Sequence, residues 1–224
     1  MPGTRELPPP LPPETRTVGQ LVAESVRLYQ RRFWPSLALG VPAAVIDGVS
    51  ANLPRVAVFV FVPVAGAVLL TASYVGASAI AAEARTERRP LVTAFVAGIV
   101  VFLPFPFLAS IFILPGLAWL AFIGLAVPVA VNERLGVRAS LARATELARA
   151  DYVHVLGGLA TLAITVFLTR TVLFFLLRGI GEAEALAASA LADIVISPLL
   201  FLGAALLYFD QAARAGVAHQ ARTA

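Results

Sequence analysis

Apolar residues run through this chain in long stretches that charged residues interrupt at only a few places. The stretch 94–131 contains no charged residue and has far more than the ~20 residues needed to cross a bilayer once. The pattern therefore predicts an all-α polytopic membrane protein with six transmembrane helices. We expect the crossings at residues 34–51, 56–82, 91–113, 116–131, 152–175 and 186–209.

Prolines indicate how the longest apolar run, 91–131, divides into two crossings. Pro115–Gly116 favours a break, because proline lacks a backbone N–H and glycine is a poor helix former. Pro104 and Pro106 fall within the third crossing and should kink it. The last two crossings form a hairpin, whose turn we expect near Gly181.

Two more polar segments have helical periodicity and predict amphipathic helices at 17–32 and 137–150. Thr17 followed by Gln20 fits a capping box, which predicts that the first of these helices starts there. Its apolar face would carry Val18, Leu21, Val22, Ser25, Leu28 and Tyr29. The second helix would gather Val137, Leu141, Ala144, Leu147 and Ala148 on one side. We expect both helices to lie in the cytoplasmic membrane interface.

The distribution of arginine predicts the orientation of the six crossings. Fourteen arginines fall on the side that holds both chain ends, and three (Arg55, Arg170 and Arg178) fall on the other. Because cytoplasmic segments carry an excess of basic residues, both termini are predicted to be cytoplasmic. The proline-rich segment 1–16 is expected to be a disordered cytoplasmic tail, 17–212 a single membrane domain, and 213–224 a second cytoplasmic tail.

Composition narrows the class further. Mean hydropathy is +0.88, and 59% of the residues are hydrophobic, which excludes an ordinary soluble domain. There is no cysteine, which excludes disulfides and thiol chemistry. The net charge of +4 comes from arginine alone, a usage typical of a GC-rich bacterial genome. We therefore expect a protein of the bacterial inner (plasma) membrane that binds no nucleic acid. Its basic helices should contact anionic lipid of the inner leaflet, through Arg27, Arg31, Arg32, Arg138 and Arg149.

The chain contains three blocks that follow the pattern of a known family. They are “TVGQLVAESVRLYQRRFWPSLALG” from Thr17, “AAEARTERRPLVTAF” from Ala81 and “PG…VPVAVNERLGVRASLARATEL” from Pro115. These blocks resemble the bacterial family named for the membrane domain of glycerophosphoryl diester phosphodiesterase. The resemblance implies a multi-helix membrane unit, which in that family stands alone or precedes a soluble phosphodiesterase barrel. We expect a stand-alone membrane domain here, without the catalytic barrel.

Few residues of the chain suggest chemistry. The two histidines, His154 and His219, belong to no cluster with metal-ligand spacing, and we expect no metal and no cofactor. No nucleophile–base set and no phosphate-binding loop is visible in the sequence. The expectation is a protein that is not an enzyme.

The exception is a pair of charged residues inside apolar segments. Arg170 lies eleven residues before Gly181 and Asp193 lies twelve after it, so the hairpin should bring them to similar depth. A charge in hydrocarbon costs about 3 kcal/mol or more unless it is paired or hydrated. Asp47 should reach the same level from the first crossing. Three interpretations stay open: a structural ion pair, a lipid-headgroup or substrate site, or residues beyond the helix ends in solvent.

The sequence therefore favours a non-catalytic membrane protein that acts as a lipid-interacting or scaffold module. A small-molecule or lipid transporter is the alternative, and it predicts a polar cavity near the midplane. A membrane-embedded enzyme that acts on lipids is a third possibility. A homo-oligomer, or a protein partner at the cytoplasmic helices, is compatible with the sequence.

Overall fold

The computed structural model describes residues 12–82, 88–177 and 181–223, and every regular element in these ranges is a helix. The helices are η1 (Pro13–Thr15), α1 (Val18–Arg31), α2 (Phe33–Ala38), α3 (Val41–Ser50), α4 (Arg55–Ala81), α5 (Arg88–Phe102), α6 (Phe105–Ile111), α7 (Ile113–Ile123), α8 (Ala126–Glu133), α9 (Val137–Ala150), α10 (Tyr152–Leu177) and α11 (Glu182–Thr223).

Six segments of the described chain are long and apolar enough to cross a membrane. They are Phe33–Ser50, Arg55–Ala81, Arg89–Ile111, Ile113–Glu133, Tyr152–Leu173 and Leu186–Gly216. Each overlaps one predicted crossing, so the predicted all-α class and the predicted number of such helices are confirmed. The segment between the second and third predicted crossings, 83–90, lies mostly outside the described residues.

Two boundaries differ from the prediction. The third and fourth spans separate at Phe112 rather than at Pro115–Gly116. Pro115 instead lies in the first turn of α7, where a missing N–H breaks no helical hydrogen bond. At the C-terminus, α11 continues as one helix to Thr223, whereas residues 213–224 were predicted to be a tail. This segment is rich in alanine and contains no proline, so it carries no strong helix-breaking residue after the apolar span ends.

Three of the six spans consist of two consecutive helices. Phe33–Ser50 is interrupted between α2 and α3, and Ile113–Glu133 is interrupted between α7 and α8. The third span is interrupted between α5 and α6, where Pro104 is the N-cap of α6 and Pro106 lies in its first turn. The two prolines therefore do more than kink this segment, because they end one helix and begin another.

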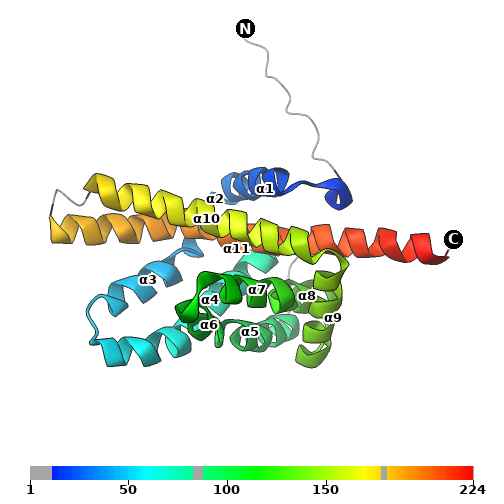
Figure 1. The fold of residues 1–224 in the computed structure, drawn as a ribbon, viewed down its shortest axis with the longest axis horizontal. Coiled ribbons are helices and arrows are strands. Elements are labelled where there is room, and N and C mark those ends of the chain that lie inside the picture. The colour runs from blue at the N-terminus through cyan, green and yellow to red at the C-terminus, as the bar shows by residue number, and fades with distance from the viewer. Residues whose placement is uncertain (1–11, 83–87, 178–180, 224) are drawn as a thin grey trace, which may run out of the picture.

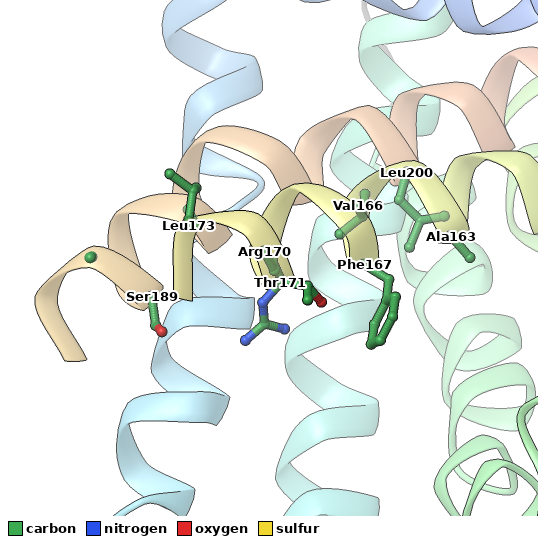
Figure 2. Close-up of a pocket in the computed structure, with 10 residues that line it drawn as sticks. Ala163, Val166, Phe167, Arg170, Thr171, Leu173, Ser189 and Leu200 are labelled. Atoms are coloured by element: carbon green, nitrogen blue, oxygen red, sulfur yellow. The ribbon is translucent and has the colours of Figure 1, made fainter. Parts of the chain in front are cut away.

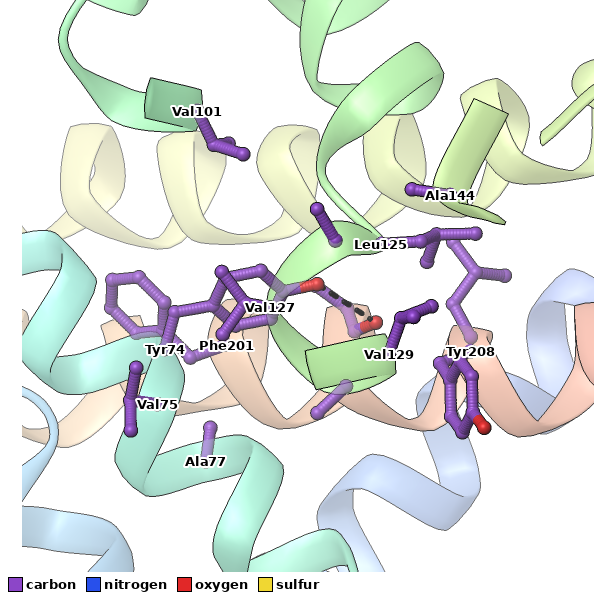
Figure 3. Packing of buried hydrophobic residues seen from close by; sticks show 14 of the residues in the cluster. Tyr74, Val75, Ala77, Val101, Leu125, Val127, Val129, Ala144, Phe201 and Tyr208 are labelled. Atoms are coloured by element: carbon purple, nitrogen blue, oxygen red, sulfur yellow. Dashed lines mark hydrogen bonds between the residues drawn. The ribbon is translucent and has the colours of Figure 1, made fainter. Parts of the chain in front are cut away.

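Helices α10 and α11 form a long antiparallel pair, against which α1 to α4 and α7 to α9 pack, while α5 and α6 pack on α4, α7 and each other. Figure 1 shows α1 on one side of this pair and α3 to α9 on the other. The core between α4, α8 and α11 is mostly apolar. Val127 and Val129 of α8 are fully buried in it, and the Tyr74 hydroxyl of α4 donates a hydrogen bond to Ala204 O of α11 (3.3 Å; Figure 3).

The break between α2 and α3 is built on a close contact with α11. A Cβ atom on Gly40 would collide with the backbone of Asp193 and Ile194. Pro198 lies four residues after Ile194 and has no N–H group. The Ile194 carbonyl oxygen therefore accepts no i+4 backbone hydrogen bond within α11. The backbone of α2 is held by a second contact, in which Ser73 Oγ donates to Leu39 O at 2.8 Å. As a result α3 begins beside the segment of α11 that carries Asp193.

Helices α1 and α9 occupy the two ranges predicted to be amphipathic. The capping box predicted for α1 is confirmed, since Thr17 Oγ1 accepts from Gln20 N and Gln20 Oε1 accepts from Thr17 N. On α1 the residues Leu21, Ser25, Leu28 and Tyr29 are buried, and Leu21 lies against Gly158 of α10. On α9 the buried residues are Ser140, Ala144, Leu147 and Ala148. Both apolar faces thus pack on the protein, and a position in the membrane interface stays a prediction.

The end of the predicted N-terminal tail is docked on the helical core. η1 packs against α11, and Arg16 is buried. The prediction that 1–16 is a disordered tail is therefore wrong for Pro13 to Arg16, while residues 1–11 lie outside the described ranges. The physical reason is that Arg16 finds a buried carboxylate on α11, described below.

Candidate functional site

The structure brings together the three charged residues that the sequence places at similar depth. Arg170 Nε of α10 lies 3.0 Å from Asp193 Oδ1 of α11, and Arg170 Nη2 donates to Asp47 Oδ2 of α3. We call Asp47, Arg170 and Asp193 the ion triad. Since Arg170 and Asp193 lie inside α10 and α11 and the Asp193 side chain is 1% exposed, the interpretation that places both residues beyond the helix ends in solvent is wrong.

Exposure differs sharply within the ion triad. The Asp193 side chain is 1% exposed, whereas the side chains of Arg170 and Asp47 are 40% and 45% exposed. Among the described residues, Asp193 Oδ2 accepts no hydrogen bond. The buried Asp193 carboxylate therefore holds the guanidinium of Arg170 in place. The exposed parts of Arg170 and Asp47 carry opposite charges.

The ion triad lies near the same end of three apolar spans. Arg170 is three residues from the end of Tyr152–Leu173, and Asp47 is three residues from the end of Phe33–Ser50. Asp193 is seven residues inside Leu186–Gly216, which at 1.5 Å per residue is about 10 Å. The ion triad therefore lies toward one end of these spans rather than at their middle.

A groove of about 420 Å³ runs beside Arg170 between α10 and α11 (Figure 2). Its polar side chains, Arg170, Thr171 and Ser189, lie within three residues of the ends of their spans. Farther along α10 the lining becomes apolar, with Phe167, Val166 and Ala163. The groove is therefore amphipathic along its length, with its charge at the shallow end.

An apolar cavity of about 110 Å³ lies behind the deep end of this groove. Ala163 and Leu200 line both the groove and the cavity, so the two adjoin at these side chains. The other cavity walls include Tyr74, Phe102 and Phe201. Such a surface accepts hydrocarbon and offers little to a polar solute.

The five arginines predicted to contact inner-leaflet lipid differ in their partners. Arg27 and Arg31 pair with Glu24 at 3.4 and 3.0 Å. The Arg149 guanidinium lies over the Phe122 ring, 5.8 Å from its centroid. Arg32 and Arg138 are exposed. The structure therefore does not gather these residues into one patch, and their contact with lipid stays a prediction.

A second group of charged and polar side chains lies at the C-terminal end of α8. Arg143 of α9 lies 3.4 Å from Glu133 and donates to Glu146 at 3.2 Å. Burial lowers the pKa of the Arg143 guanidinium, but its hydrogen bonds with the two carboxylates and their charges more than offset burial, so that the pKa stands above its ordinary value. The Tyr208 hydroxyl of α11 donates to Glu133 at 3.2 Å, which ties α8, α9 and α11 together.

The sequence analysis missed a larger cluster at the opposite end of α11 from the ion triad. Arg16 Nη1 donates to Asp210 Oδ1 at 2.7 Å, and Arg214 Nη1 donates to Asp151 Oδ2 at 2.7 Å. His154 Nε2 lies 3.9 Å from Asp210 Oδ2. We call Arg16, Asp151, His154, Asp210 and Arg214 the C-terminal charge cluster. Its sequence signals were the i, i+3 spacing of Asp151 and His154 and the i, i+4 spacing of Asp210 and Arg214.

The C-terminal charge cluster joins the segment before α1 to the C-terminal part of α11 and to the start of α10. Arg214 Nη2 donates to the carbonyl oxygen of Arg16 at 2.8 Å, and Asp151 Oδ1 accepts from His154 N at 3.1 Å. Asp210 is fully buried. In the described part of the chain, no group of three or more histidine or acidic residues is arranged to hold a metal ion.

Comparison with known proteins adds no identification. No family model, no curated protein and no solved structure matches the chain. The resemblance to the phosphodiesterase membrane-domain family thus rests on the three sequence blocks alone. The class that the fold defines is an all-helical protein with six helices long and apolar enough to span a membrane.

Proposed function

We propose that this chain is a non-catalytic integral membrane protein that binds a membrane phospholipid in the groove between α10 and α11. The observation that carries the proposal is the polarity of the groove, with Arg170 at its shallow end and apolar walls toward Ala163. A phospholipid has the same order of polarity along its length. Arg170 would contact the phosphate, because a guanidinium binds phosphate oxygens through directed N–H donors.

The surroundings of the groove support an occupant from the bilayer. Large apolar side chains elsewhere on the spans are exposed, among them Val56, Phe59, Ile164 and Val172. Exposed apolar surface on this scale indicates contact with lipid. The apolar cavity behind Ala163 and Leu200 favours an acyl chain over a polar solute, so a lipid-binding function is preferred to a polar-solute transporter.

Retention of a defined lipid tests this function. Native mass spectrometry of the protein in mild detergent should detect one class of phospholipid bound to the wild type, and Arg170→Ala should reduce that bound fraction at least fivefold. Val166→Trp, which would fill the groove and leaves the ion triad unchanged, should have the same effect. Arg55→Ala removes an exposed arginine at the same end of the molecule and should retain the lipid.

The two variants separate a binding defect from a folding defect. If Arg170→Ala fails to fold, Val166→Trp still reports on the groove. Wild type and both variants carrying only the same bulk lipid would contradict the proposed function.

We further propose that the protein lies in the bacterial plasma membrane with both termini in the cytoplasm. The support is the arginine asymmetry across the six spans. Because the chain has no cysteine, single cysteines report the side directly. In intact cells an impermeant maleimide should label Gly181→Cys and leave Ala139→Cys unlabelled, and permeabilised cells should label both. The reverse pattern in intact cells would overturn the orientation.

A further inference from the structure

The ion triad has more negative than positive groups, and this excess constrains the headgroup of the lipid that the groove accepts. Two carboxylates surround one guanidinium, so the triad has a formal charge of −1 with both acids ionised. A headgroup with only negative charge would add to this excess. A headgroup that carries a cation beside its phosphate would compensate it.

The exposed parts of the triad offer both kinds of contact. Among the described residues, Arg170 Nη1 takes part in no hydrogen bond, since Asp193 lies at Nε and Asp47 accepts from Nη2. Nη1 is therefore free to donate to a phosphate oxygen. Asp47 is 45% exposed, and a carboxylate accepts several donors, so it has capacity for a further N–H group. The buried Asp193 keeps the guanidinium in place for this arrangement.

We infer that the groove selects a zwitterionic phospholipid with a primary ammonium group, such as phosphatidylethanolamine, its phosphate at Arg170 and its ammonium at Asp47. This inference rests on the proposed lipid-binding function and adds the headgroup. Thr171 and Ser189 line the same shallow end and supply hydroxyl groups to the headgroup. The acyl chain follows Phe167 and Val166 toward Ala163, about 10 Å deeper along α10 than Arg170.

Competition among lipids with identical acyl chains tests the inference. Delipidated full-length protein in detergent is mixed with equal amounts of phosphatidylethanolamine, phosphatidylcholine and phosphatidylglycerol, and bound lipid is quantified by native mass spectrometry. We expect phosphatidylethanolamine to be retained most. Phosphatidylcholine has the same charges but no N–H donors, so it should follow, and the anionic phosphatidylglycerol should be retained least. This ranking needs no variant.

Asp47→Asn tests the role assigned to the carboxylate. The change keeps the size of a half-exposed side chain and removes its charge, so it leaves Arg170 paired with Asp193. It should lower the ratio of bound phosphatidylethanolamine to phosphatidylglycerol about three- to fivefold, the size expected for one partly exposed ionic contact. Arg55→Ala should leave this ratio unchanged.

The outcomes separate the inference from the function on which it rests. If the wild type retains phosphatidylglycerol as well as or better than phosphatidylethanolamine, or if Asp47→Asn leaves the ratio unchanged, the headgroup assignment is wrong and the lipid site stands. If the wild type retains none of the three lipids above bulk, the lipid site itself is overturned.

Discussion

Arg16→Ala should destabilise the protein by about 3 kcal/mol, because it leaves a fully buried carboxylate without its cation. Asp210 is 0% exposed, and His154 Nε2 lies 3.9 Å from its other carboxylate oxygen. The loss also releases η1, which packs on α11 beside this pair. The free energy of unfolding, measured by SDS titration in mixed micelles, reports the effect.

A matched arginine and a double variant serve as controls for this result. Arg27 pairs with Glu24 at 3.4 Å and its side chain is 36% exposed, so Arg27→Ala should cost less than about 1 kcal/mol. Arg16→Ala/Asp210→Asn should recover part of the stability lost in Arg16→Ala, since the unpaired charge is removed. Equal losses for Arg16→Ala and Arg27→Ala would show that the buried pair contributes nothing beyond a surface contact.

Arg170→Ala should lower the free energy of unfolding by about 3 kcal/mol, since it leaves the buried Asp193 carboxylate unpaired in an apolar span. Asp193→Ala leaves Arg170 with Asp47 and with access to the groove, so its loss should be smaller. The double variant Arg170→Ala/Asp193→Ala should be more stable than Arg170→Ala alone. The same SDS titration measures all three.

The double-mutant cycle distinguishes coupling from two independent effects. We expect a coupling free energy of about 1 kcal/mol or more between Arg170 and Asp193, as found for residues in direct contact. Strictly additive losses would mean that the two side chains do not interact in the folded protein. Arg55→Ala, at an exposed position at the same end of the molecule, should change stability by less than about 0.5 kcal/mol.

Local pattern was sufficient to predict much of the helical framework. The capping box at Thr17 and Gln20 is a contact between residues three apart, and the α9 range 137–150 follows from helical periodicity. Segment boundaries were less predictable where proline is present. In the sequence Pro115 predicts the end of a helix, but proline is equally compatible with the first turn of one. In the structure Pro115 lies in the first turn of α7.

The ion triad was partly predictable, because a hairpin fixes depth. Counting from the turn near Gly181 brings Arg170 and Asp193 to one level without knowledge of how the helices rotate. The contact between Arg170 and Asp47 was only suggested as a shared level. It depends on the break at Gly40 and on the close approach of this glycine to Asp193 and Ile194, which no local pattern announces.

The sequence by itself determined the class: six apolar helical segments, their order, and charged residues that need partners inside them. These follow from the length of uncharged runs and from helical periodicity, which are properties of neighbouring residues. Only the tertiary structure decided which charges meet. Arg16 and Asp210 are 194 positions apart, and the groove beside Arg170 is formed by side chains of two helices. The physical reason is that such contacts depend on how helices rotate and pack against one another, and many distant residues set that packing together.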